Sequence, residues 1–171
     1  MRFLTGMLEK LQLLWRPRLA VNSTLWQRGV SELRKRSAGV RESGAFLLGR
    51  NDGGRRIVEE FLYYDDIDPG CLDDGYINFD GRKLGLVWKR CRETGCALVA
   101  DVHTHPRGYG QSGIDKENPM HPQKGHIGLI IPFYAQREST PGRIGIYEYF
   151  GAFDWKDHSR QGRTFMKLVA R

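Results

Sequence analysis

Two histidines separated by one residue, His103 and His105, end an apolar stretch and are followed by Pro106. Side chains of an extended strand alternate between its two faces, so the two imidazoles share one face, about 7 Å apart along the backbone. At that spacing both rings can bind one metal ion. Pro106 lacks a backbone donor and ends the strand, which predicts a site at the carboxyl end of a strand, where open sheets commonly carry their chemistry.

A catalytic zinc ion requires three protein ligands and one open position, so the histidine pair needs a third partner. Asp115 follows the segment RGYGQSG (107–113), whose glycines let the chain fold back toward the histidines. Asp101 shares the strand face of both histidines and is the alternative third ligand, or an outer partner that holds an imidazole N–H. Asp115 can also serve as a helix cap, and from the residues alone these possibilities stay open.

Hydrolysis at such a site also requires a base for water and a donor for the oxyanion of the intermediate. Glu42 begins an apolar strand, an unusual place for a carboxylate, and is the predicted base. Ser112, between the histidines and Asp115, is the predicted donor.

Four other titratable residues are expected to have no role in the chemistry of the site. Glu59 and Glu60 are expected to be surface or salt-bridged carboxylates of a partner strand. His121 and His126 are expected to be solvated loop histidines, with contact to a substrate as the alternative.

The elements that must position these residues alternate between strands and helices. The turn NDGG at 51–54 is typical of a hairpin. Asn22 or Ser23 is predicted to cap the first helix and Asp80 the second. The expected strands cover 19–22, 42–50, 55–66, 96–106, 125–135 and 142–155, and the expected helices cover 22–39, 81–95 and 163–171. This order predicts a single α/β (α+β) domain around a mixed sheet, over residues 19–171, after a basic and helical segment at 1–18.

Composition narrows the class of protein. The 171 residues suffice for one domain with its own core. Apolar runs fall short of the roughly 20 residues of a membrane span, and three cysteines without a CxxC pair favour a reducing cytoplasm. The net charge of +7 attracts acidic partners, but no recognisable nucleic-acid-binding module accompanies it, so specific nucleic-acid binding is not expected.

Three short motifs in this order resemble the JAMM motif of the JAB/MPN metalloprotease family. They are a glutamate before the small-residue strand SGAFLLG (43–49), then HTHP (103–106), then SGID (112–115). The similar order of elements extends from about Leu19 to Trp155. The resemblance implies a curved mixed sheet flanked by helices, in a three-layer arrangement like that of cytidine deaminases.

The same resemblance implies the roles of five residues. One zinc ion would be bound by His103, His105 and Asp115, while Glu42 would activate water and Ser112 would help to hold the oxyanion. It also implies hydrolysis of isopeptide or peptide bonds after the C-terminal glycine of ubiquitin or a ubiquitin-like protein.

Departures from the family pattern lie in the loops. The loop RGYGQ (107–111) is one residue shorter than in eukaryotic deubiquitinases, and segments 65–79 and 116–126 lack their long insertions. The chain therefore looks more like stand-alone prokaryotic members, some of which accompany E1-like and E2-like proteins in antiphage conjugation systems. A catalytically silent MPN scaffold and a basic nucleic-acid-binding protein of the same fold are the alternatives.

Overall fold

The computed structural model describes residues 17–170, so most of the basic segment predicted to be helical at 1–18 lies outside the described residues. Within this range, eight strands form one mixed sheet. The strands are β1 (Leu19–Asn22), β2 (Gly44–Asp52), β3 (Arg55–Tyr63), β4 (Ala97–Thr104), β5 (Ile127–Ile131), β6 (Gly145–Gly151), β7 (Asp154–Asp157) and β8 (Met166–Val169). They lie in the order β7-β6-β5-β4-β2-β3-β1-β8, which places β2 and β4 at the centre.

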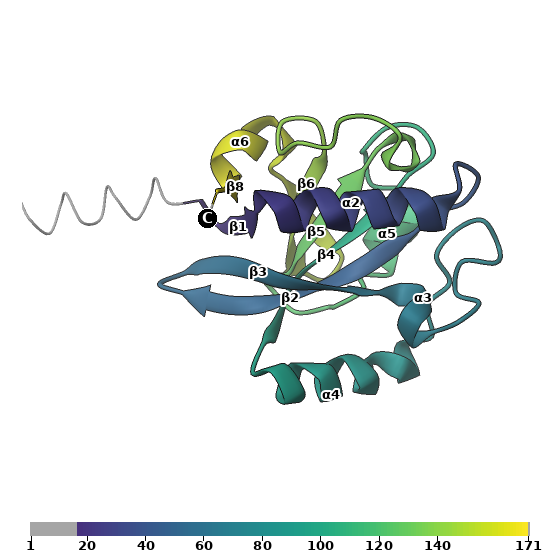
Figure 1. Ribbon diagram of the computed structural model, residues 1–171, viewed down its shortest axis with the longest axis horizontal. Helices are drawn as coiled ribbons and strands as arrows, with labels where there is room; N and C mark the ends of the chain where they lie inside the picture. The colour runs from purple at the N-terminus through teal and green to yellow at the C-terminus, as the bar shows by residue number, and fades with distance from the viewer. Residues whose placement is uncertain (1–16, 171) are drawn as a thin grey trace, which may run out of the picture.

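Helices cover both faces of this sheet (Figure 1). The α-helices are α2 (Ser23–Ser37), α3 (Tyr64–Ile67), α4 (Leu84–Thr94), α5 (Gly113–Glu117) and α6 (Gly162–Phe165), and the 3-10 turns are η1 (Gly81–Lys83), η2 (Phe133–Ala135) and η3 (Ser159–Gln161). Helices α2 and α4 lie on opposite faces, which confirms the predicted mixed α/β arrangement of a sheet flanked by helices.

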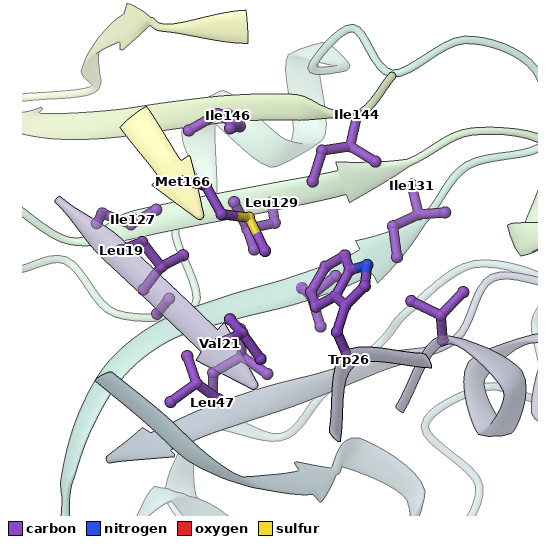
Figure 2. Close-up of a cluster of buried hydrophobic side chains, with 14 of the residues drawn as sticks. Leu19, Val21, Trp26, Leu47, Ile127, Leu129, Ile131, Ile144, Ile146 and Met166 are labelled. Carbon is purple, nitrogen blue, oxygen red and sulfur yellow. The ribbon is translucent and has the colours of Figure 1, made fainter. Parts of the chain in front are cut away.

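Two apolar cores enclose the central strand β2. Ala45 and Leu47 point into the core beneath α2, whereas Phe46 and Leu48 point into the core beneath α3 and α4. Both faces of β2 are therefore buried, and this explains why its sequence is continuously apolar instead of alternating. Figure 2 shows the first core, in which Trp26 of α2 projects toward the strands.

Strand pairing in the sheet is mixed. Strand β1 runs parallel to both β3 and β8, and β4 runs parallel to β5. The β2–β3, β2–β4, β5–β6 and β6–β7 pairs are antiparallel. The pairing of β2 with β3 on one side and β4 on the other joins the hairpin to the strand that carries the two histidines.

Helix boundaries follow the predicted caps with small shifts. The side chain of Asn22 accepts hydrogen bonds from the N–H groups of Thr24 and Leu25, which identifies Asn22 and not Ser23 as the cap of α2. Asp80 caps the 3-10 turn η1, so α4 begins one turn later than predicted, at Leu84. Gly95 ends α4 in the left-handed conformation, as predicted.

The C-terminal segment differs from the prediction. Residues 163–171 were expected to form a helix, but α6 ends at Phe165 and β8 follows it, pairing with β1 from the Leu19–Met166 register onward. The reason is tertiary, because β1 offers a free edge beside the core and Met166 fills the core there.

Two further boundaries differ from the sequence-based expectation. The strand predicted at 142–155 is a hairpin of β6 and β7, turned at Ala152 and Phe153 with positive φ angles of 49° and 64°. The strand predicted to reach residue 66 ends at Tyr63, where α3 begins. None of the helices within the described residues is long and apolar enough to cross a membrane.

The β8 assignment predicts the effect of shortening Met166, whose side chain is fully buried. Replacing it by alanine leaves a cavity, so Met166→Ala should lower the free energy of unfolding by about 2–5 kcal/mol. Urea denaturation followed by circular dichroism measures this loss. Lys167→Ala, at the exposed neighbour, should change stability by less than about 0.5 kcal/mol. Equal effects of the two substitutions would contradict the alternating burial of β8.

Candidate metal centre

The carboxyl end of β4 holds the two histidines in place through backbone hydrogen bonds. Gly44 of β2 pairs with His103. One residue beyond the strand, the His105 N–H donates to the carbonyl of Ile131 at 2.9 Å, and the N–H of Tyr134 donates to the His105 carbonyl at 2.8 Å. Neighbouring strands thus fix the backbone on both sides of the motif, and the two Nε2 atoms lie 3.0 Å apart.

The start of helix α5 holds the Asp115 side chain beside the two histidines. The Oγ atom of Ser112 accepts a hydrogen bond from the Asp115 N–H, and the Asp115 carboxylate accepts one from the Ser112 N–H at 2.6 Å, which forms a capping box. The same carboxylate lies 3.4 Å from Nε2 of His103 and 3.2 Å from Nε2 of His105. Ser112 and not Asp115 is therefore the N-cap of α5, and the Asp115 carboxylate completes the capping box while it also contacts the histidines.

This group of three side chains could hold a metal ion. Ligand atoms about 2.1 Å from a tetrahedral zinc ion lie about 3.4 Å from one another. The Nε2 atoms of His103 and His105 lie 3.0 Å apart, Oδ1 of Asp115 lies 3.4 Å from Nε2 of His103, and Oδ2 of Asp115 lies 3.2 Å from Nε2 of His105. One ligand atom from each residue can be chosen so that all three lie within 4.8 Å of one another. Two imidazole nitrogens and one carboxylate oxygen also match the ligand types of catalytic zinc sites, so the residues present fit such an ion.

Charges in the group favour a cation. Burial alone would lower the pKa of His103, but the carboxylates of Asp101 and Asp115 outweigh it and raise that pKa to about 10. Burial would raise the pKa of Asp115, and the two histidines instead hold it well below its usual range. The carboxylates therefore create a negative potential at the imidazole nitrogens, where a metal ion would be attracted.

Glu42 lies two residues before the start of β2, and its side chain points toward the three residues of the metal group. Its Oε1 lies 3.9 Å from Nε2 of His105, outside the group of three that could bind the metal. Burial raises the pKa of its carboxyl group, although both histidines oppose this shift. The structure thus brings the predicted base next to the predicted ligands.

A buried cluster of hydroxyl groups fixes the segment that carries Glu42. The Ser43 N–H donates to Oγ1 of Thr104 at 2.9 Å, and the Thr104 N–H donates to the Ser43 carbonyl at 2.8 Å. The Ser43 hydroxyl donates to the carbonyl of Leu33, and Ser37 of α2 lies within hydrogen-bond distance of both hydroxyls. Thr104 points away from the metal group and ties β4 to the Glu42 segment and to α2.

Ser112 lies beside the metal group, and the hydrogen bonds of the helix cap do not use its hydroxyl proton. Its Oγ acts as an acceptor for the Asp115 N–H at 3.1 Å, so the O–H can donate to another acceptor. The side chain is exposed and lines the cleft next to the metal group. This position is compatible with the predicted role of an oxyanion donor.

The cleft has a volume of about 840 Å³ and reaches from the metal group to β6 and β7. Its walls are largely apolar and aromatic, formed by residues that include Tyr76, Ile77, Phe79, Leu84, Met120, Ile130, Tyr147, Tyr149, Phe153 and Trp155. Four acidic residues, Glu42, Asp101, Asp115 and Glu117, also line it, and no lysine or arginine of the described chain does. The cleft is therefore acidic within a protein whose net charge is +7.

Asp101 lies behind the histidines, outside the group that could bind the metal. Its Oδ2 is 3.9 Å from Nδ1 of His103, the nitrogen remote from Asp115, so it does not act as the third ligand in this arrangement. Its carboxylate contacts Nε2 of His126 at 2.6 Å and accepts a hydrogen bond from the Tyr64 hydroxyl at 3.1 Å.

The loop histidines differ from the prediction that both are solvated. His126 is buried because it contacts Asp101, and His121 is half-buried, with its ring against the rings of Trp88 and His126.

Tyr64 and His126 were not identified from the sequence as residues that support the site. A glycine at position 44, within an otherwise apolar strand, was the only sequence feature that indicated a large side chain packed against this point. A Cβ atom at Gly44 would lie 2.3 Å from the Tyr64 ring. Glu59 and Glu60 form ion pairs with Arg50 and Arg90 near the surface, as predicted.

The chain matches no protein-family model. Among solved structures it is similar to the solution structure of protein DSY2949 from Desulfitobacterium hafniense, with a TM-score of 0.65 and 17% sequence identity. The match covers 90% of this chain and 94% of the other. This similarity shows a shared fold over nearly the whole chain.

The geometry of the metal group predicts the effect of neutralising Asp115. Asp115→Asn keeps an oxygen that can accept from the Ser112 N–H but removes the charge at the imidazole nitrogens. Zinc affinity, measured by competition with a chromophoric chelator, should fall by a factor on the order of 100, at least as much as for loss of an outer-shell partner. Asp154→Asn, an exposed carboxylate of β7, is the matched control and should bind zinc like the unmodified protein. Equal affinity of both variants would show that Asp115 is not a ligand.

Proposed function

We propose that this protein is a zinc-dependent isopeptidase or peptidase of the JAMM type, with a JAB/MPN-like fold. The observation that carries the proposal is the convergence of the three motif elements at the cleft. His103 lies near the end of β4 and His105 directly after it, Asp115 reaches them from α5, and Glu42 faces them from just before β2. These residues are separated by up to 73 positions in the sequence, and only the fold brings them together.

A zinc ion bound by His103, His105 and Asp115 would polarise the scissile carbonyl and lower the pKa of a water molecule. Glu42 accepts the proton of the attacking water and returns it to the amine that leaves, either a lysine ε-amine or a peptide nitrogen. The Ser112 hydroxyl donates a hydrogen bond to the oxyanion. Glu42, Ser112 and two of the three proposed ligands, His103 and Asp115, line the same cleft.

The proposed substrate is the C-terminal tail of a ubiquitin-like protein. An extended tail can lie in the cleft, and glycines at the scissile bond allow the backbone to approach the metal group closely. The cleft is bordered by Trp155 of β7, the last strand on that side of the sheet, so the tail can add as a further strand along this edge.

The compact loops suit a stand-alone enzyme of a bacterial conjugation pathway. Segment 65–79 contains the short helix α3 and a few turns, and 116–126 is similarly short. We place the protein in the cytoplasm beside E1-like and E2-like partners in a ubiquitin-like conjugation system of antiviral defence, where it processes precursors or releases conjugates.

The experiment that tests this function compares the unmodified protein with Glu42→Gln. Cleavage of a fusion between a ubiquitin-like protein and a C-terminal reporter is followed by gel electrophoresis, and zinc content is measured on the same samples. Loss of a general base typically costs 10²–10⁴-fold in rate, so cleavage should fall by about that factor. Zinc content should stay near one ion per chain, because Glu42 lies outside the ligand group.

Glu59→Gln serves as the matched control, because it removes one carboxylate from the neighbouring strand β3, where Glu59 pairs with Arg50. It should cleave at the unmodified rate. A Glu42→Gln variant that also retains full activity would refute Glu42 as the base. Unmodified protein that binds zinc without cleaving any such fusion would favour a partner-binding scaffold.

A further inference from the structure

A buried carboxylate supports the metal centre from behind. The Asp101 side chain is 5% exposed and points between three other side chains. One oxygen contacts Nε2 of His126 at 2.6 Å, while the other accepts a hydrogen bond from Tyr64 at 3.1 Å and lies 3.9 Å from Nδ1 of His103. Asp101 therefore connects a histidine of the metal group to two side chains that play no part in the proposed chemistry.

The arrangement places Asp101 on the far side of the His103 ring. Nε2 of His103 faces Asp115 and His105, whereas Nδ1 faces Asp101. A histidine that binds a metal through one nitrogen usually has a carboxylate, a carbonyl or a water at the other, which fixes the tautomer and the orientation of the ring. At 3.9 Å the imidazole and the carboxylate are in electrostatic contact and are too far apart for a hydrogen bond.

We propose that Asp101, held in place by Tyr64 and His126, is a positioning residue that orients His103 for metal binding. This inference rests on the proposed metal centre and adds to it the part of the chain that sets its affinity. Tyr64 and His126 act one step further out, since each fixes one oxygen of Asp101.

Three features of the fold build this arrangement. Asp101 and His103 are two residues apart on β4 and so share one face. Asp101 pairs with Gly128 of β5, which brings the preceding residues of that strand, and with them His126, alongside Asp101. Gly44 leaves space for the Tyr64 ring, which would otherwise meet a Cβ atom 2.3 Å away.

The partners of Asp101 distinguish it from an ordinary buried ion pair. Within residues 17–170, its ion-pair contacts are to imidazoles alone. The structure offers a comparison in Glu148 and His158, whose Oε2 and Nε2 atoms lie 3.0 Å apart. That carboxylate is also bound by Arg18, and its pair lies outside the cleft lining.

The test compares Asp101→Asn with Glu148→Gln, because each removes the charge from a buried carboxylate that contacts a histidine. Zinc affinity is measured by chelator competition, and the protein loaded with Co²⁺ gives an absorption spectrum that reports ligand geometry. Asp101→Asn should bind zinc 10- to 100-fold more weakly and change the cobalt spectrum. Glu148→Gln should leave both unchanged, even where it lowers the melting temperature.

Tyr64→Phe provides a second variant, because it keeps the buried ring and removes only the hydroxyl. It should weaken zinc binding by a smaller factor than Asp101→Asn, and its folding can be verified by circular dichroism. Unchanged zinc affinity and an unchanged cobalt spectrum in Asp101→Asn would overturn the inference. If that variant does not fold, the same result in Tyr64→Phe would overturn it.

Failure of this inference can be separated from failure of the proposed function. Unmodified protein that binds no zinc would refute the metal centre itself. Unmodified protein and Asp101→Asn that bind zinc equally well would refute only the positioning role of Asp101.

Discussion

The pairing of β2 with β4 is the interaction on which the candidate site depends. In the antiparallel ladder Gly44, the first residue of β2, pairs with His103. The pairing extends to the residue before β2, because the Thr104 N–H donates to the Ser43 carbonyl. Glu42 consequently lies across from His105. A shift of one residue would turn every side chain of β4 to the other face, moving the histidines into the core and Thr104 into the cleft. The chemistry proposed for this site therefore depends on a backbone register.

Several features fix that register. Side chains of different size enter the two cores, with Ala45 and Leu47 of β2 on one face and Phe46 and Leu48 on the other. Irregularities next to Leu48 interrupt the ladders to both β3 and β4, and bulges of this kind bend a sheet and prevent strands from sliding. Gly49 is required at this point, since a Cβ atom would lie 1.8 Å from the carbonyl oxygen of Ile57. The hydroxyls of Ser37, Ser43 and Thr104 satisfy one another beneath the site, where an unpaired polar group would destabilise the fold.

The sequence predicted the site better than it predicted the edges of the sheet. His103 and His105 could be grouped because their type and spacing are restrictive, and Glu42 was singled out because a carboxylate beside an apolar strand is unusual. The residues alone left both Asp101 and Asp115 open as the third ligand, and the resemblance to the JAMM motif implied Asp115. The C-terminal segment was assigned to the wrong element because local pattern does not reveal the free edge of β1 that recruits Met166. His126 was misjudged for a similar reason, since its burial follows from the pairing of β4 with β5, a contact between segments about 25 residues apart. Local propensity gives the elements, whereas contacts between distant segments decide which polar residues are buried.

The distribution of charge separates the site from the rest of the surface. A net charge of +7 alone would suggest an anionic partner, but the charged residues that line the cleft are acidic apart from His103. Such a cleft attracts a metal ion and repels the phosphates of a nucleic acid, whose binding is dominated by contacts with lysine and arginine. The same acidic walls favour a substrate tail or leaving amine that carries positive charge. The basic residues must therefore serve surfaces other than the cleft, and the overall charge of the protein is a poor guide to the chemistry of its site.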